Sequence, residues 1–315
     1  MVKHERHYTG PTLSRLQRDG FASILALAFL AFGSAGCVQQ APDAIPLSLV
    51  SPSSVPKPTP TPVEPTEQVP TEVPVAECTE KIGSFRTGAY AGVAVAADVP
   101  LNVYLPPCYS AQDGTYPTLY LLHGYPYDQD HWQELGASEI ADGGIGEGDW
   151  PPFIMVMPLQ PDPLFRGSDG GPGSYESELI EGLIPYIESN YRSDPSERAL
   201  AGISRGGVWA LEVAFRNPME FTSVAALSPA LAVNSARAPY DPFNIVANSG
   251  RLPQNILLLA GDKDWAAVET ERLSRALTDA GIEHVFAITP GDHADETWAA
   301  VIEEVFGFFA LGEMP

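Results

Sequence analysis

The stretch 200–209, LAGISRGGVW, places Ser204 in the pattern Gly-x-Ser-x-Gly. The apolar run 198–203 before it is typical of a short strand, and residues 204–218 after it are typical of a helix that ends at Asn-Pro. A serine on a sharp strand-to-helix turn is exposed as a nucleophile, and the helix N-terminus favours developing negative charge. We therefore expect Ser204 to be the nucleophile of an acyl-transfer site.

A serine nucleophile needs a general base, and the chain order narrows the choice of histidine. Where such a turn carries the nucleophile, the acid and then the histidine follow it along the chain. Of the two histidines after Ser204, His284 begins a strand expected over 284–291, away from the catalytic edge. His293 lies just past the end of that strand, at the same sheet edge as the serine. We expect His293 to be the base.

Two acidic residues compete to orient this histidine. Asp262 and Asp264 both come directly after an apolar strand expected over 255–261. Parallel strands end at one edge of a sheet, so either carboxylate lies within reach of His293. The residues themselves leave the choice open.

Backbone N–H groups that hold the oxyanion are expected at two places. One belongs to Arg205, the residue after the nucleophile. The other belongs to the loop after a strand expected over 117–124, where Gly124 makes the turn and Tyr125 supplies the N–H. His123 in the same stretch is expected to shape the loop rather than to react.

The remaining pattern predicts an α/β fold with a mostly parallel sheet and helices on both faces. Strands and helices alternate along the chain from residue 84 onward. Pro185 is expected to kink one of the helices. The other expected strands cover 101–107, 152–158 and 221–229, and the other expected helices cover 174–191, 267–280 and 295–310.

Two long segments, 159–173 and 229–254, interrupt this alternation after strand ends. Ligands bind at the carboxyl ends of strands in such sheets, so we expect these segments to form the substrate loops. Three aromatic residues near the expected site are candidates for lining its pocket: Phe165, Trp132 and Trp265.

Residues 1–37 have the features of an export signal, with four basic residues before a short apolar run that ends at Cys37. Ser34, Ala35 and Gly36 precede this cysteine as small residues do in the lipobox of bacterial lipoproteins, although leucine is usual at the position of Ser34. The pattern predicts an exported protein that is lipidated at Cys37 and anchored to the membrane. Ordinary signal cleavage nearby is the alternative.

Residues 38–77 are expected to form a disordered tether, because 41–76 contains ten prolines among Thr, Val, Glu and Ser. The rest, 78–315, is long enough for one domain with a sizeable core. Cys78 and Cys108 form an even pair in an exported protein, and they flank a stretch that can fold into a hairpin. We therefore predict a disulfide between them.

The formal net charge of −23 excludes a nucleic-acid partner, because no basic patch is present to hold a phosphate backbone. The sequence contains no His-Glu-x-x-His pattern and no cysteine–histidine cluster, so we expect neither a metal nor another cofactor. The acidity favours solubility and says nothing of the substrate.

Several stretches occur together in one order: VYLPPCY, YPTLYLLHG, SELIEGLIPYIESNYR, ALAGISRGG, LLLAGDKD and PGDH. Over roughly 99–310 the chain resembles the esterase family of α/β-hydrolases that includes enterochelin-type esterases, S-formylglutathione hydrolases, feruloyl esterases and mycolyltransferases. The resemblance implies an α/β-hydrolase fold with a triad of Ser204, Asp264 and His293. It favours Asp264 over Asp262, because the family's acid lies three residues after the glycine that ends its strand.

The resemblance also assigns the oxyanion loop to Gly124 and Tyr125. Arg205 stands where the family frequently has methionine, but only its backbone N–H is needed. The leading hypothesis is an exported serine esterase that acts through an acyl-enzyme on a small-molecule or polysaccharide-linked ester. The alternatives are an acyltransferase with a non-water acceptor and a non-catalytic binding lipoprotein on the same scaffold. The sequence does not predict the oligomeric state.

Overall fold

The computed structural model describes residues 78–311, which is almost the whole of the predicted domain. The predicted signal peptide, 1–37 with Cys37, and the predicted linker, 38–77, lie outside the described residues. Within 78–311, no helix combines the length and the apolar character that a membrane crossing requires.

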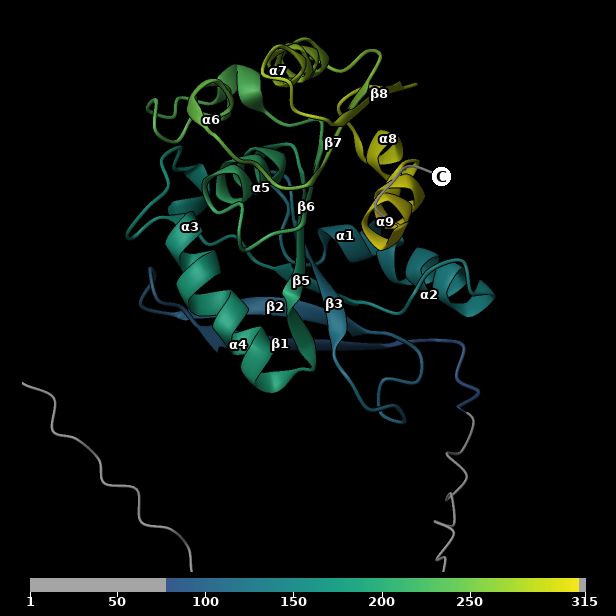
Figure 1. Cartoon of the computed structure of the whole chain (residues 1–315). Coiled ribbons are helices and arrows are strands. Elements are labelled where there is room, and N and C mark those ends of the chain that lie inside the picture. The colour runs from purple at the N-terminus through teal and green to yellow at the C-terminus, as the bar shows by residue number, and fades with distance from the viewer. Residues whose placement is uncertain (1–77, 312–315) are drawn as a thin grey trace, which may run out of the picture. The chain divides into compact units, whose positions relative to one another are not determined.

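An eight-stranded sheet forms the centre, in the order β1-β2-β4-β3-β5-β6-β7-β8 (Figure 1). The pairs β1–β2 and β2–β4 are antiparallel, and all other neighbouring strands run parallel. The predicted mostly parallel sheet is therefore confirmed. The strands are β1 (Ser84–Ala91), β2 (Asp98–Leu105), β3 (Tyr116–Leu122), β4 (Ile154–Pro158), β5 (Ser193–Ile203), β6 (Ser223–Leu227), β7 (Asn255–Gly261) and β8 (Val285–Thr289).

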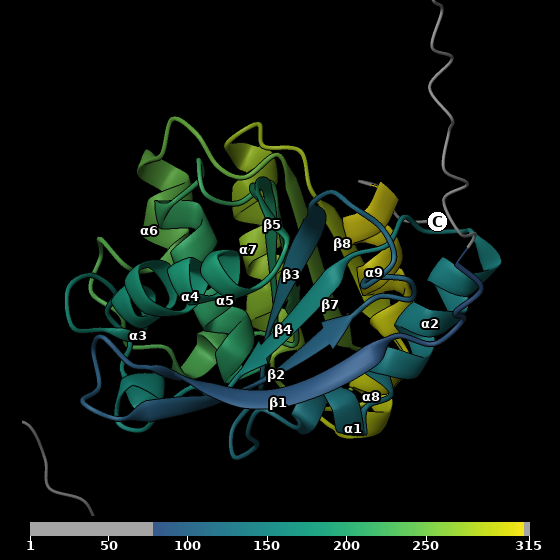
Figure 2. The same cartoon turned by 90° about the horizontal axis from the view of Figure 1, so that it is seen from below.

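Helices cover both faces of the sheet (Figure 2), which confirms the predicted α/β-hydrolase architecture. Successive side chains of a strand point to opposite faces, so Tyr120 joins one core with α3 to α7 while Leu121 joins the other with α1, α2, α8 and α9. The helices are α1 (His131–Glu134), α2 (Ala137–Glu147), α3 (Tyr175–Ser177), α4 (Ile184–Asn190), α5 (Arg205–Arg216), α6 (Pro242–Asn248), α7 (Ala267–Asp279), α8 (Asp295–Ala299) and α9 (Ile302–Leu311).

The helix predicted over 174–191 is divided into three pieces. Between α3 and α4 the chain forms a π-helical turn over Glu178–Leu183. Pro185 is the second residue of α4, inside a helical stretch that runs without a break from residue 175 to residue 190. The regular α-helix is thus interrupted by a π-helical turn directly before this proline, and the expected kink stays a prediction.

Three helices were not among the predicted elements, and each has a weak sequence pattern. α2 contains three glycines in ASEIADGGIGE, which lower its helix propensity. α6 lies inside the segment 229–254 and buries only Pro242 and Val246. α1 has only four residues, too few for a helical period to show.

Cys78 and Cys108 form the predicted disulfide, with a Cα–Cα distance of 5.8 Å. The antiparallel pair of β1 and β2 lies between them in the sequence and brings the two cysteines together. Glu80 accepts the backbone N–H of Cys108 at 2.9 Å and so supports the same junction. The bond ties the start of the described chain to the segment that follows β2.

Candidate active site

Ser204 lies on a strained turn between β5 and α5. Its φ of 53° is in the left-handed region, which is unfavourable for a residue with a side chain. The two flanking glycines permit this turn by close approach. A Cβ at Gly202 would lie 2.2 Å from the Gly206 carbonyl oxygen, and one at Gly206 would lie 2.4 Å from the His123 carbonyl oxygen. The backbone thus has the geometry of a nucleophile elbow.

The structure brings together the three residues expected to form the triad. His293 Nε2 lies 2.8 Å from Ser204 Oγ, and His293 Nδ1 lies 2.8 Å from Asp264 Oδ1. With Nδ1 protonated, the ring donates to the carboxylate and accepts the serine O–H, which is the arrangement that proton abstraction from Ser204 requires. Each residue follows or lies near the carboxyl end of a parallel strand, so the sheet itself determines their proximity.

The geometry distinguishes between the two candidate acids. Asp264 has a fully buried side chain, and its Oδ1 also accepts the Ala266 N–H at 2.7 Å. Asp262 is exposed and accepts the Gly291 N–H at 2.9 Å instead. Burial raises the pKa of Asp264, but the hydrogen bonds that its carboxylate accepts, led by the one from His293, outweigh the effect of burial, and the net shift is downward. Asp264 is therefore placed and charged to orient the imidazole.

The two backbone amides expected to hold an oxyanion flank the serine. A Cβ built on Gly124 would lie 3.5 Å from Ser204 Cβ, so the loop after β3 adjoins the nucleophile. Within the described part of the chain, the N–H groups of Tyr125 and Arg205 have no hydrogen-bond partner. Two free donors beside a nucleophile match the requirement of a tetrahedral oxyanion.

Two buried histidines support this loop from behind. His123 Nδ1 bonds to the Gly124 carbonyl at 2.9 Å, its Nε2 accepts the Gln160 N–H at 2.9 Å, and burial lowers its pKa to about 4. His123 is thus neutral and structural, as expected. His131, which the sequence reasoning passed over, accepts the Gly124 N–H at 3.4 Å and lies 3.3 Å from Asp295. Only the fold shows that second support.

A pocket of about 500 Å³ opens at the serine. Both expected substrate loops contribute to its wall, and Trp265 lies 4.5 Å from His293 between ring centroids. Phe165 also lines the pocket, but Trp132 is only 1% exposed and packs in the core, so its expected place there is wrong. The lining residues are Tyr125, Phe165, Arg166, Ser168, Ser204, Arg205, Ala230, Val233, Ser235, Trp265 and His293.

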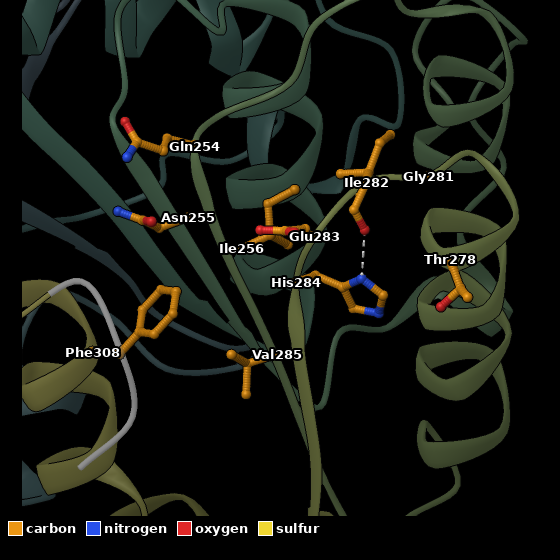
Figure 3. Close-up of a pocket in the computed structure, with 10 residues that line it drawn as sticks. All are labelled: Gln254, Asn255, Ile256, Thr278, Gly281, Ile282, Glu283, His284, Val285 and Phe308. Carbon is orange, nitrogen blue, oxygen red and sulfur yellow. Dashed lines mark hydrogen bonds between the residues drawn. The ribbon is translucent and has the colours of Figure 1, made fainter.

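His284 lies elsewhere, as its place before β8 predicts. It lines a pocket of about 630 Å³ at the starts of β7 and β8. Figure 3 shows its ring hydrogen-bonded to the Ile282 carbonyl. Its Nε2 bonds to Ser274 of α7 at 2.7 Å. These contacts tie α7 to the turn that precedes β8, and His284 takes no part in the site around Ser204.

The described residues contain one cluster of three side chains with metal-ligand atoms, formed by Cys78, Glu80 and Cys108. Both sulfur atoms of this cluster are bonded to each other in the disulfide. A disulfide sulfur is not a thiolate and does not bind a metal as one does. The cluster is therefore a structural junction.

The serine lies on a strand–turn–helix junction, the histidine and the carboxylate follow later strands, and the sheet is mostly parallel. These features define an α/β-hydrolase with a Ser-His-Asp arrangement. The sequence matches the Esterase family (described as "Putative esterase") over residues 93–309. The chain belongs to this family.

Two relatives that are named esterases show moderate identity over part of their length. Esterase Rv1288 of Mycobacterium tuberculosis is 30% identical over 195 residues, which cover 59% of this chain and 39% of that protein. Ferri-bacillibactin esterase BesA of Bacillus subtilis is 29% identical over 156 residues, covering 45% and 53%. The chain thus spans about two fifths to about half the length of these relatives.

Solved structures show the same fold over nearly their whole length. A ferulic acid esterase superposes with a TM-score of 0.66 at 24% identity, covering 73% of this chain and 98% of that one. An S-formylglutathione hydrolase from Staphylococcus aureus gives a TM-score of 0.63 at 18% identity, covering 72% and 99%. At these identities the similarity is one of fold.

Proposed function

We propose that this protein hydrolyses carboxylic esters through a covalent acyl-enzyme. The observation that carries the proposal is the hydrogen-bonded chain from Ser204 through His293 to Asp264, with both distances at 2.8 Å. His293 removes the Ser204 proton as the oxygen attacks the ester carbonyl, and it then returns that proton to the leaving alcohol. Water activated by the same histidine releases the acid and restores the serine.

Two charges develop in this reaction, one on the oxyanion and one on the His293 ring, and the site has a group that stabilises each of them. The Tyr125 and Arg205 amides donate to the tetrahedral oxyanion, and Asp264 stabilises the imidazolium that forms on His293. Membership of the Esterase family supports this chemistry, as do relatives that are named esterases. We propose as substrate a small-molecule ester or an ester attached to a polysaccharide, in keeping with the feruloyl esterases among the relatives.

The proposal is tested by hydrolysis of p-nitrophenyl acetate and by labelling with a fluorophosphonate probe. Ser204→Ala is expected to lose the label and at least about 10³-fold in kcat. Ser196→Ala, at an exposed serine earlier in β5, is the matched control and is expected to keep both. Hydrolysis or labelling that survives in Ser204→Ala would contradict the assignment. Product analysis with added alcohols separates hydrolysis from acyl transfer.

We also propose that the protein is exported and anchored by a lipid on Cys37, with residues 38–77 as a tether for the domain. The support is the sequence pattern of residues 1–37 together with the disulfide between Cys78 and Cys108, a bond that persists in oxidising compartments. Cys37→Ala is expected to move the protein from the membrane fraction to the soluble fraction. Equal distribution of both forms would contradict the anchor.

A further inference from the structure

The side chain of Arg205 projects into the wall of the active-site pocket, beside the nucleophile. Its Nε donates to the Phe165 carbonyl at 3.2 Å, its Nη1 donates to Asn234 Oδ1 at 3.1 Å, and its Nη2 donates to the Gly167 carbonyl. These bonds join the two long loops across the pocket. All three acceptors are neutral, and one N–H remains on each of Nη1 and Nη2, because a guanidinium has five.

No carboxylate balances this charge. Among the ion pairs of residues 78–311, none includes Arg205. Burial lowers its pKa to about 10, so the guanidinium stays charged at neutral pH. The carboxyl that acts on it through space is Glu212, whose pKa burial raises to about 8, so this group is largely neutral there. Arg205 is half-buried and its guanidinium carbon lies 5.3 Å from the centroid of the Trp209 ring, but no carboxylate pairs with it. A partly desolvated charge that no carboxylate neutralises favours a bound anion.

A second cation lines the same pocket. Arg166 pairs with Asp162 at 3.0 Å, but both side chains are exposed, so this bridge contributes little. The Ser168 and Ser235 hydroxyls are hydrogen-bonded to each other at 3.3 Å, so one of the two O–H groups stays free to donate to a ligand. None of the residues that line the pocket is Asp or Glu. The pocket lining thus carries two arginines and no carboxylate, although the chain has a net charge of −23, and this local excess of positive charge favours an anionic ligand.

We propose that the site selects esters that carry a negatively charged group, a carboxylate or a phosphate, which binds the free N–H groups of Arg205 with Arg166 at the rim. The inference rests on the proposed function. A neutral ester group accepts only ordinary hydrogen bonds from this guanidinium and a cationic one is repelled by it, whereas an oxyanion group also neutralises its charge through charge-assisted hydrogen bonds. The reaction itself is unchanged: ester and water give an acid and an alcohol, one of which bears the charge.

The test compares kcat/KM for matched pairs in which a terminal carboxylate is replaced by the neutral amide. Monoethyl adipate and its amide place the group on the acyl part, and 6-acetoxyhexanoate and its amide place it on the alcohol part. Phosphate-ended counterparts of both distinguish the two kinds of anion. We expect a preference of about tenfold or more for the anion in at least one series, which falls as salt is added. A ratio near one in every series would overturn the proposal.

Variants separate charge recognition from loop support. Arg205→Gln is expected to reduce the anion-to-amide ratio about 10- to 100-fold and Arg205→Lys to reduce it less. Arg166→Gln, at an exposed side chain, is expected to reduce it about two- to fivefold. The matched control is Arg275→Gln, which removes one positive charge from the exposed surface of α7 and should leave the ratio unchanged. If Arg205→Gln lowers kcat/KM equally for anion and amide, the arginine only joins the loops and the proposal is wrong.

A binding measurement keeps this inference distinct from the proposed function. If no ester is turned over, the proposed function fails, but calorimetry on the Ser204→Ala variant still compares adipate with its diamide. Adipate is expected to bind at least about tenfold more tightly, and Arg166→Gln in the same background is expected to narrow the difference. Equal affinity of the diacid and the diamide would overturn anion selection whatever the catalytic result.

Discussion

Replacing Asp264 with asparagine removes the negative charge behind His293 while keeping the size of the side chain. Asp264 Oδ1 accepts both the His293 ring at 2.8 Å and the Ala266 N–H at 2.7 Å. An asparagine oxygen in that place still accepts both bonds, but it leaves the imidazolium without a counter-ion. The flipped amide directs its NH₂ at the Ala266 N–H and forces the other tautomer of His293, which then cannot accept the Ser204 proton.

The expected loss follows from the charge pair. Two unit charges about 4 Å apart, which approximates a delocalised imidazolium and carboxylate in hydrogen-bond contact, interact by about 4 kcal/mol at an effective dielectric constant near 20. Asp264 is fully buried and the His293 side chain is 17% exposed, so water replaces little of this interaction. At about 1.4 kcal/mol per factor of ten, kcat should fall about 10³-fold, and the wrong tautomer would lower it further.

The assay is steady-state hydrolysis of p-nitrophenyl acetate at neutral pH, with folding checked by circular dichroism. Asp262→Asn is the matched control, since the same substitution two residues away alters an exposed group that bonds to Gly291. Its kcat should stay within about threefold of wild type, because it touches neither Ser204 nor His293. A loss below tenfold in Asp264→Asn, or an equal loss in both variants, would refute the reasoning.

Two further predictions concern stability. Burial raises the pKa of Glu212 from 4.5 to about 8. Between pH 4.5 and pH 8 the folded chain therefore keeps a proton on Glu212 that the unfolded chain releases. The free energy of unfolding consequently falls as the pH rises from 4.5 to 8. In thermal unfolding, Glu212→Gln should therefore raise the Tm at pH 8 and change it little near pH 4.5. A difference in Tm between the variant and the wild type that does not depend on pH would contradict this prediction. Replacing Cys78 and Cys108 with serine frees a loop of 30 residues and should cost about 3 to 4 kcal/mol in chemical unfolding. A reductant should destabilise the wild type but not the double serine variant. An equal effect of the reductant on both proteins would argue against the Cys78–Cys108 disulfide.

Most of the parallel sheet was predictable because its strands are continuous apolar runs buried on both faces. The run NILLLAG corresponds to β7 without a change of boundary. The elements that the sequence did not predict are short or glycine-rich, as α1 and α2 are, and packing rather than local propensity stabilises them.

The sequence by itself predicted the proposed nucleophile, the proposed base and their order, because both depend on local patterns: a glycine-bounded turn between a strand and a helix, and a histidine after the last strand. Residues alone left Asp262 and Asp264 open, and the resemblance to a family was needed to favour one. The tertiary structure distinguishes the two aspartates, although only two positions separate them. The Asp262 side chain is exposed to solvent, whereas the Asp264 side chain is buried and lies 2.8 Å from the His293 imidazole.

Only the tertiary structure decided what surrounds the serine. Trp132 lies near the oxyanion loop in sequence, yet it packs in the core, whereas Trp265 and Phe165 line the pocket. The state of Arg205 also depends on the fold, because a guanidinium is paired or unpaired according to groups that approach from distant parts of the chain. Charge compensation and burial are sums over three-dimensional neighbours, and no pattern along the chain around LAGISRGGVW contains them.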